Sequence, residues 1–389
     1  MRDAYVIGAG QSSFGSYVDE TYLTLFEEAF DAAVESVGNT FDPSTIDEAY
    51  LGTLGVGGRQ IGLSGSAVTE HVGLHGIPTT RVEAACASSG YAVRSAVMAV
   101  RSGMVDVALA GGYEVMTDMS ADAIRWWLGV SGETEWERMS GTTFAGVYAQ
   151  MASAYLDAYD ATVEDLSRVA VKNHANGAQN PKAHLSFECS LKDAVSAPPI
   201  TDPLNLYHCC PTSDGASAVI VASEAVAEEV SADLIRVAGT GAASGRVGLF
   251  QRESLTSIPA SVTAAEQAYE EANITPSDVG FAEVHDCFAI AELMAYEDLR
   301  LCERGEAPEL LRQGETDADG RIPVNTSGGL KSKGHPIGAT GGGQIVEAVE
   351  QLRGTAHVQV DDPRIGLCHN VGGSGGGVTV HILEKEGSA

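Results

Sequence analysis

The sequence predicts an α/β fold made of two similar halves, and two observations lead to this prediction. Short apolar runs bounded by glycine alternate with longer helical patterns, which is typical of buried strands followed by helices. The same succession of elements begins again near residue 235. Two such units placed face to face would form a cleft where strands end and helices begin, and ligands of these sheets bind there.

In the first half, the pattern alternates between strand and helix until about residue 116. Strands are expected at 4–8, 48–52 and 105–110, and helices at 23–37 and directly after Cys86. Residues 117–199 then lack any strand-like repeat and carry large aromatic and sulfur side chains among polar stretches. We therefore expect an inserted loop domain at about 117–199, followed by a buried strand at 215–222 that completes a half spanning 1–234.

The second half, 235–389, repeats the order of element types, which suggests a duplication. Its expected elements are strands at 235–238, 279–284, 365–368 and 378–383, and helices at 261–272, from 289 onward and at 341–352.

Composition narrows the class of protein. No stretch approaches the ~18 uninterrupted apolar residues of a membrane helix, and the N-terminus lacks a signal-peptide pattern, so a soluble cytoplasmic protein is expected. The chain has 53 acidic and 23 basic residues and a net charge of −30, a field that repels nucleic acid and anionic membranes. Because the carboxylates are dispersed, they predict an acidic surface suited to a salt-rich, halophilic cytoplasm.

Two cofactor signals are absent or weak. The seven cysteines include no C-x-x-C pair, which argues against a structural zinc site, and no metal is expected. The opening glycine-rich segment resembles a dinucleotide fingerprint, but its third glycine is Gly15 instead of residue 13 and no helical pattern follows. A tight exit from a strand explains it better than a nucleotide site.

Cys86 stands at the start of a helical pattern that ends at Gly103. Unpaired N–H groups and the positive end of the helix dipole should lower the pKa of a cysteine there and favour the thiolate. This is the environment of a nucleophile. On composition alone, a small buried side chain among alanines is an equally good interpretation.

Three further segments place polar side chains between an expected strand and helix, or beside glycine. The run 325–341 presents His335 between Gly334 and Pro336, where a histidine is well placed to move protons. The segment 283–289 contains His285 and Cys287. The segment 368–377 is rich in glycine, whose backbone N–H groups could stabilise an oxyanion.

Together, in this order and spacing, the four segments resemble the active-site segments of the thiolase superfamily over essentially the full chain. The resemblance is strongest to thiolases of the sterol-carrier-protein type and their archaeal relatives. Other thiolases have Asn-Glu-Ala-Phe where this chain has His-Asp-Cys-Phe at 285–288, and a catalytic cysteine where it has Asn370. The resemblance therefore implies that the second base has moved to Cys287. Cys368 is the competing candidate, although its apolar neighbours indicate a buried strand.

The resemblance also implies a role for each matched residue. His335 accepts the proton of Cys86, which becomes the acyl carrier, and His285 stabilises an oxyanion. Gly372 and the Cys86 N–H form a second oxyanion hole. Ser327 and Gly329 line the pantetheine channel of coenzyme A, and Phe288 contacts the substrate. The implied fold consists of two duplicated βαβαβαββ halves in a five-layer αβαβα arrangement.

The implied function is that of an acyl-CoA C-acyltransferase, a beta-ketothiolase that condenses acyl-CoA with acetyl-CoA or cleaves 3-ketoacyl-CoA. Its substrates are coenzyme A thioesters, and no further cofactor is expected. The resemblance implies a homodimer or tetramer and a small partner protein with an OB-fold and a zinc ribbon. Two alternatives stay open: a fold-related ketoacyl or hydroxymethylglutaryl-CoA synthase, and a non-catalytic scaffold that acts through a partner.

Overall fold

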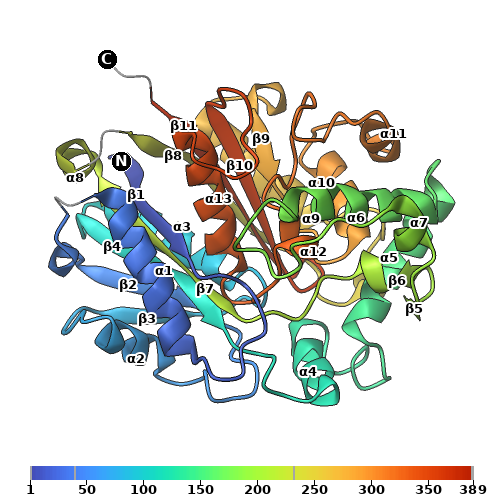
Figure 1. Ribbon diagram of the computed structural model, residues 1–389, viewed down its shortest axis with the longest axis horizontal. Coiled ribbons are helices and arrows are strands. Elements are labelled where there is room, and N and C mark those ends of the chain that lie inside the picture. Colours follow the sequence, from blue (N-terminus) through green and yellow to red (C-terminus); the bar gives the residue numbers. More distant parts are fainter. Residues whose placement is uncertain (1, 39–40, 231–232, 387–389) are drawn as a thin grey trace.

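The computed structural model describes residues 2–38, 41–230 and 233–386, and within them nine strands form one hydrogen-bonded sheet in the order β3-β2-β4-β7-β1-β8-β11-β10-β9 (Figure 1). The strands are β1 (Ala4–Gln11), β2 (Glu48–Gly52), β3 (Thr79–Val82), β4 (Val107–Glu114), β7 (Gly215–Ser223), β8 (Ile235–Ser244), β9 (Phe281–Glu283), β10 (Ile365–Gly372) and β11 (Gly377–Lys385). A separate small sheet contains β5 (Pro199–Thr201) and β6 (Leu204–Asn205).

The helices lie between these strands in the chain. They are α1 (Tyr22–Val37), α2 (Ser64–His71), α3 (Ser88–Ser102), α4 (Ala121–Leu128), α5 (Phe144–Ala158), α6 (Val163–Gly177), α7 (Leu191–Val195), α8 (Glu224–Val230), α9 (Pro259–Ala272), α10 (Ala289–Asp298), α11 (Ala307–Arg312), α12 (Gly329–Ser332) and α13 (Thr340–Arg353). Among the described residues, no helix is both long and apolar enough to cross a membrane. The expected α/β fold is confirmed.

The large sheet consists of two parts with the same topology. In the first part β2 and β4 are parallel, and β4–β7 and β7–β1 are antiparallel. In the second part β9 and β10 are parallel, and β10–β11 and β11–β8 are antiparallel. Even the edge strand β3 has a counterpart, because Val324 forms a single parallel bridge with Ala282 of β9. The repeated order and directions are the expected signature of a duplicated unit.

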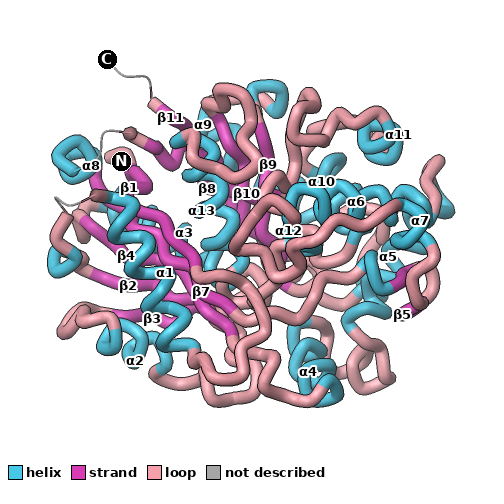
Figure 2. Tube along the Cα trace, in the orientation of Figure 1, coloured by secondary structure: helices cyan, strands magenta, loops and turns pink. Residues whose placement is uncertain are grey.

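Helices cover both faces of each part (Figure 2). Helix α1 packs on β1 and β7 at the outer face of the first part, and α9 packs on β8 and β11 at the outer face of the second. Helices α3 and α13 lie between the two parts and contact each other. Their N-terminal ends approach so closely that a Cβ on Gly341 would lie 2.5 Å from the backbone nitrogen of Gly90.

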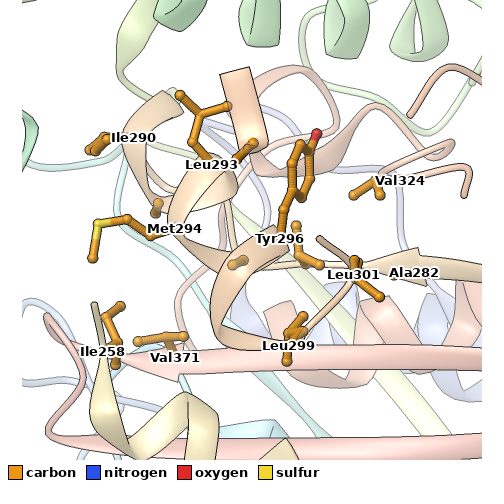
Figure 3. Close-up of a cluster of buried hydrophobic side chains, with 14 of the residues drawn as sticks. Ile258, Ala282, Ile290, Leu293, Met294, Tyr296, Leu299, Leu301, Val324 and Val371 are labelled. Carbon is orange, nitrogen blue, oxygen red and sulfur yellow. The ribbon is translucent and has the colours of Figure 1, made fainter. Parts of the chain in front are cut away.

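Three buried apolar clusters follow these layers: one under α1, one around α3 and α13, and one that joins α9 and α10 to the helices after β4. Figure 3 shows part of the third cluster, with Ile290, Leu293 and Met294 of α10 above Ile258 and Val371. Burying aliphatic side chains of this size stabilises the fold by about 1.5–3 kcal/mol each. The clusters hold the strand-to-helix junctions of both parts at fixed positions.

Candidate active site

A cavity of about 500 Å³ lies where these junctions meet. Cys86 precedes α3, His335 and Ile337 precede α13, and Cys287 and Phe288 precede α10. The remaining lining comes from residues after β4, from α4 and α5 and from the segment before β7, and includes Met116, Arg125, Leu128, Ser131, Thr143, Phe144, Ala145, Pro199, Ile200, Cys209, Cys210, Pro211 and Thr212. The lining is mainly apolar with a few polar groups, as in small-molecule sites.

A strained turn presents Cys86 to the cavity. Ala85 has a φ of +50°, a left-handed conformation that alanine rarely adopts and that costs of order 1–3 kcal/mol. The Ser88 hydroxyl holds this turn, because its oxygen accepts the Ala84 N–H at 3.0 Å and it donates to the Ala85 carbonyl at 2.6 Å. The turn points the Cys86 side chain inward, where 2% of the residue is exposed.

The expectation of a lowered pKa at Cys86 is wrong. Burial and, to a smaller extent, the nearby Glu114 carboxylate raise the pKa of this thiol to about 12, although the backbone N–H of Gly373 lowers it in part. The local effect of the helix N-terminus is therefore smaller than the cost of desolvating a thiolate. At neutral pH the resting group is a thiol, which needs a base close by.

Two histidines lie beside this thiol. One ligand-type atom from each of Cys86, His285 and His335 lies within 4.8 Å of the other two, and the histidine rings have centroids 5.1 Å apart at an angle of 83°. The rings come from the loops before α10 and α13. The structure thus brings together the nucleophile and both histidines that the sequence singled out.

Hydrogen bonds define the tautomer of His335. The Thr340 hydroxyl donates to the Pro336 carbonyl at 2.9 Å, so at its 2.7 Å contact with His335 Nδ1 it must accept. The proton is therefore on Nδ1, and Nε2 carries a lone pair that is buried without a hydrogen-bond partner. Burial lowers the pKa of His335 to about 3, so the ring is neutral at physiological pH and can act as a base.

His285 has the opposite tautomer. The Asn370 amide nitrogen donates to the Cys86 carbonyl at 3.0 Å, and the same nitrogen contacts His285 Nδ1 at 3.2 Å. Nδ1 must accept this bond, which leaves the proton on Nε2, another buried atom without a partner. Burial and the neighbouring His335 keep the pKa of His285 well below its ordinary value. His285 can therefore donate a hydrogen bond while it stays neutral.

Cys287 lies in a different part of the cavity wall, beside Tyr148 of α5. The Tyr148 hydroxyl donates to the Gly373 carbonyl at 3.0 Å and also interacts with the Cys287 thiol, and its ring stacks on Phe288 with centroids 4.6 Å apart. Burial raises the pKa of Cys287 well above its ordinary value. Sequence reasoning missed Tyr148 because it lies in the inserted segment, where no motif marks it.

The competing cysteine does not reach the cavity. Cys368 lies in β10 within the central apolar cluster, and its thiol donates to the Gln344 carbonyl of α13 at 3.4 Å. Its environment is that of a structural buried cysteine.

Three other expected residues occupy different places from those that the resemblance implied. Ser327 does not line the cavity, because its hydroxyl donates at 2.6 Å to the buried Glu283. Gly329 does not line it either, and a Cβ there would meet the Asp286 carboxylate at 2.5 Å. The third residue is Gly372, because the backbone N–H that donates to the Cys86 sulfur belongs to the next residue, Gly373. Ser327 and Gly329 thus support the loop from behind.

A buried carboxylate fixes the loops on both sides of the cavity. Glu114, at the end of β4, accepts the N–H groups of Leu54 at 2.9 Å, Val56 at 2.8 Å and Gly338 at 3.1 Å. Burial raises the pKa of Glu114 to about 7. Because Gly338 follows His335 closely, this carboxylate connects the histidine loop to the first half.

The chain was compared with known families and relatives. A model described as "Thiolase, N-terminal domain" matches residues 4–225, and one described as "Thiolase C-terminal domain-like" matches 241–385. Acetyl-CoA acetyltransferases of Methanothermobacter thermautotrophicus and Methanocaldococcus jannaschii are each 42% identical, over 99% of this chain and 100% of the relative. The benzoylsuccinyl-CoA thiolase subunit BbsB of Thauera aromatica is 35% identical, over 96% of this chain and 95% of its own length.

Solved structures agree with these relatives. The Ltp2-ChsH2(DUF35) aldolase superposes with a TM-score of 0.86 at 28% identity, and the match covers 100% of this chain and 99% of that one. Human mitochondrial 3-ketoacyl-CoA thiolase has a TM-score of 0.79 at 18% identity, with 99% of both chains covered, which shows a common fold.

Proposed function

The chain belongs to the thiolase family and is an acyl-CoA C-acyltransferase, and we propose that it works through an acyl group carried on Cys86. One observation carries this proposal. A buried thiol and two neutral imidazoles of opposite tautomer each place one ligand-type atom within 4.8 Å of the others, beside a mainly apolar cavity that Cys86 and His335 line. This arrangement supplies a nucleophile, its base and a neutral hydrogen-bond donor for a developing oxyanion.

In the first step, His335 Nε2 accepts the Cys86 proton as the sulfur attacks the thioester carbonyl. The base is needed because the pKa of the resting thiol is about 12. We assign the oxyanion hole of this step to the Cys86 N–H with the Gly373 N–H, in place of the expected Gly372. Coenzyme A leaves as the thiol and takes the proton from His335, so charge and atoms balance.

In the second step, Cys287 removes an α-proton from acetyl-CoA, and the enolate oxygen accepts a hydrogen bond from His285 Nε2–H. The enolate carbon attacks the acyl carbonyl on Cys86, the C–C bond forms and the Cys86 sulfur leaves. Thiolysis of a 3-ketoacyl-CoA is the same path in reverse. Phe288, on which the Tyr148 ring stacks, forms an apolar wall of the cavity that holds the reacting thioester beside Cys287.

The first test is thiolysis of acetoacetyl-CoA by the purified chain in molar salt, with Cys86→Ala, Cys287→Ala and Cys368→Ala alongside. We expect the first two variants to lose activity by at least about 10²-fold, because a nucleophile and a general base are removed. Cys368→Ala serves as the control, since its thiol lies in the central core, and it should retain activity. An inert wild-type chain, or a Cys287→Ala variant as active as Cys368→Ala, would contradict the mechanism.

We also propose that a small partner protein binds the chain and that the protein is an oligomer. The aldolase whose name joins Ltp2 to ChsH2(DUF35) supports a partner, as does the subunit status of the Thauera relative. Affinity purification at high salt followed by mass spectrometry and light scattering tests both points. A chain that elutes alone as a fully active monomer would contradict them.

The net charge of −30 supports a further proposal, a salt-rich cytoplasmic setting. We expect molar KCl to stabilise the fold and dilution of the salt to unfold it, as followed by circular dichroism.

We also propose that the chain divides into 1–234 and 235–389, with residues 117–199 as an inserted unit. The repeated strand order supports this division.

A further inference from the structure

A second thiol, that of Cys210, faces the proposed base Cys287 in the cavity wall. Cys209 pairs with Phe288 in an antiparallel bridge, which places Cys210 directly opposite Cys287. The Cys210 N–H donates to the Cys287 carbonyl at 3.0 Å, and both residues line the cavity together with Cys86. Directly opposed residues have Cβ atoms about 4.5–5.5 Å apart, so the two thiols are neighbours.

Lys331 is a buried lysine that contacts the backbone of the residue before Cys210. It is 1% exposed, and its ammonium donates to the Cys209 carbonyl. Two other lysines are also buried, and each forms an ion pair: Lys172 with Glu292, and Lys333 with Glu347. Among the described residues, Lys331 forms no such ion pair. A buried ammonium without a carboxylate partner stays charged only where another group supplies negative charge.

The groups that act most strongly on Lys331 are thiols. Burial lowers the pKa of Lys331, and the charges that raise it again are, in order, Cys210, Cys209, Asp286 and Cys189. Asp286 accepts the Asn173 amide and the Leu330 N–H; burial and Glu292 raise its pKa to about 7, and the Lys172 charge lowers it in part. Cys210 is thus the group with the largest effect on Lys331, although burial raises the pKa of the Cys210 thiol itself.

We propose that Cys210 and Cys287 share one proton in the resting enzyme, that the Lys331 ammonium balances their negative charge, and that this pair receives the α-proton. The inference rests on the proposed function and deepens its second step. Cys287 touches the substrate, whereas Cys210 and Lys331 act through Cys287 as positioning residues. Burial of Cys287 would otherwise leave the base with no stabilised anionic form.

The proton balance is complete. The α C–H bond breaks, its electron pair becomes the enolate, and the proton goes to the Cys287 thiolate, so that both thiols are protonated. When the C–C bond forms, the Cys86 thiolate leaves and receives one proton from the pair. The pair returns to one proton and one negative charge, and nothing is oxidised or reduced.

The other groups that face the pair would oppose or modulate this charge. Cys86 raises the pKa of both thiols, as does Asp286, whereas the Tyr148 hydroxyl lowers the pKa of Cys287 by a hydrogen bond. Burial raises the pKa of Cys210 well above its ordinary value, and Lys331 lowers it only in part. Removal of the Lys331 charge should therefore displace the titration of the pair to higher pH.

The experiment measures exchange of the acetyl-CoA methyl protons with D₂O on the full chain, together with acylation of Cys86 by mass spectrometry. In Lys331→Met we expect exchange at neutral pH to fall about tenfold or more, with the acid limb of its pH profile displaced upward by at least about one unit. Cys210→Ser should slow exchange similarly. Acylation of Cys86 should be unchanged in both, and Cys368→Ser, a buried cysteine outside the cavity, should match the wild type.

Unchanged exchange and an unchanged pH profile in both variants would overturn the inference, and so would equal losses of exchange and acylation, which indicate structural damage. If Lys331→Met does not fold, the ultraviolet absorbance of thiolate in Cys86→Ala decides. We expect Cys86→Ala to show a thiolate signal at neutral pH, and the added change Cys210→Ser to abolish it. If Cys86→Ala alone shows no thiolate signal, the shared proton is rejected. A wild type that cannot cleave acetoacetyl-CoA contradicts the proposed function itself.

Discussion

Replacement of Asn370 by Asp should abolish the hydrogen-bond donor that His285 offers to the substrate. Asn370 is 1% exposed, and its amide nitrogen holds both the Cys86 carbonyl and His285 Nδ1. A carboxylate of the same size can only accept, so it draws the His285 proton to Nδ1 and leaves a lone pair on Nε2. The enolate oxygen then faces a lone pair instead of an N–H group.

The magnitude follows from the two lost bonds. Loss of one preorganised oxyanion donor costs about 10²–10³ in kcat, or about 2.7–4 kcal/mol. The Cys86 carbonyl also loses its donor, which should lower the free energy of unfolding by about 1–3 kcal/mol. In an enzyme that stays folded, the lower stability does not by itself reduce kcat, so the loss in kcat reports on the missing donor.

Acetoacetyl-CoA thiolysis measured across pH gives the test. In the wild type the pKa of His285 is well below its ordinary value, so its charge does not change near neutrality. The introduced carboxylate raises this pKa, and protonation restores the Nε2–H, so activity relative to the wild type should recover as the pH falls. Ser261→Ala is the control, because it removes a hydrogen bond of 2.8 Å to a different histidine, His369, which lies next to Asn370 in β10. Full activity of Asn370→Asp at neutral pH, or a loss independent of pH, would refute the tautomer argument.

Three further predictions concern the same cavity. Thr340→Val removes the acceptor of the His335 Nδ1–H bond, which is worth about 0.5–1.5 kcal/mol. Acylation of Cys86 should therefore slow about two- to tenfold in stopped-flow assays, and unchanged acylation would contradict the assigned tautomer. Because the pKa of Cys86 is about 12, alkylation of Cys86 itself by iodoacetamide, located by peptide mass spectrometry, should rise continuously from neutral to alkaline pH, and a plateau for this cysteine at neutral pH would reveal an ion pair instead. Tyr148→Phe removes a hydrogen bond that lowers the pKa of Cys287, so α-proton exchange should fall up to about tenfold while acylation persists; equal rates would show that the hydroxyl is not needed.

The sequence predicted those features that depend on local pattern. Alternating strand and helix signals gave the α/β fold and its restart near 235, and the structure has β8 beginning at Ile235. The strand-to-helix junctions drew attention to four residues. The structure places Cys86, Cys287 and His335 around one cavity, and His285 beside Cys86 and His335. Residues at such junctions can be found because the junction itself leaves a trace in the sequence.

Features that depend on distant packing could not be predicted in this way. The helix N-terminus correctly suggested a special environment for Cys86, but the sign of its pKa shift depends on burial by segments far away in the sequence. Tyr148 and Cys210 come from segments without a glycine pattern, and only the folded chain places them beside Cys287. For Ser327, the resemblance implied a place in the pantetheine channel, whereas its hydroxyl donates to Glu283.

The duplication explains why the two reacting groups of the acylation step meet. Cys86 lies between β3 and α3, and His335 lies between Val324, the counterpart of the edge strand, and α13. Because the two central helices touch where Gly90 meets Gly341, the loops before them converge on one point. A single half offers only one such loop. The nucleophile and its base can therefore come from equivalent positions of two copies, and the cavity exists only where the copies face each other.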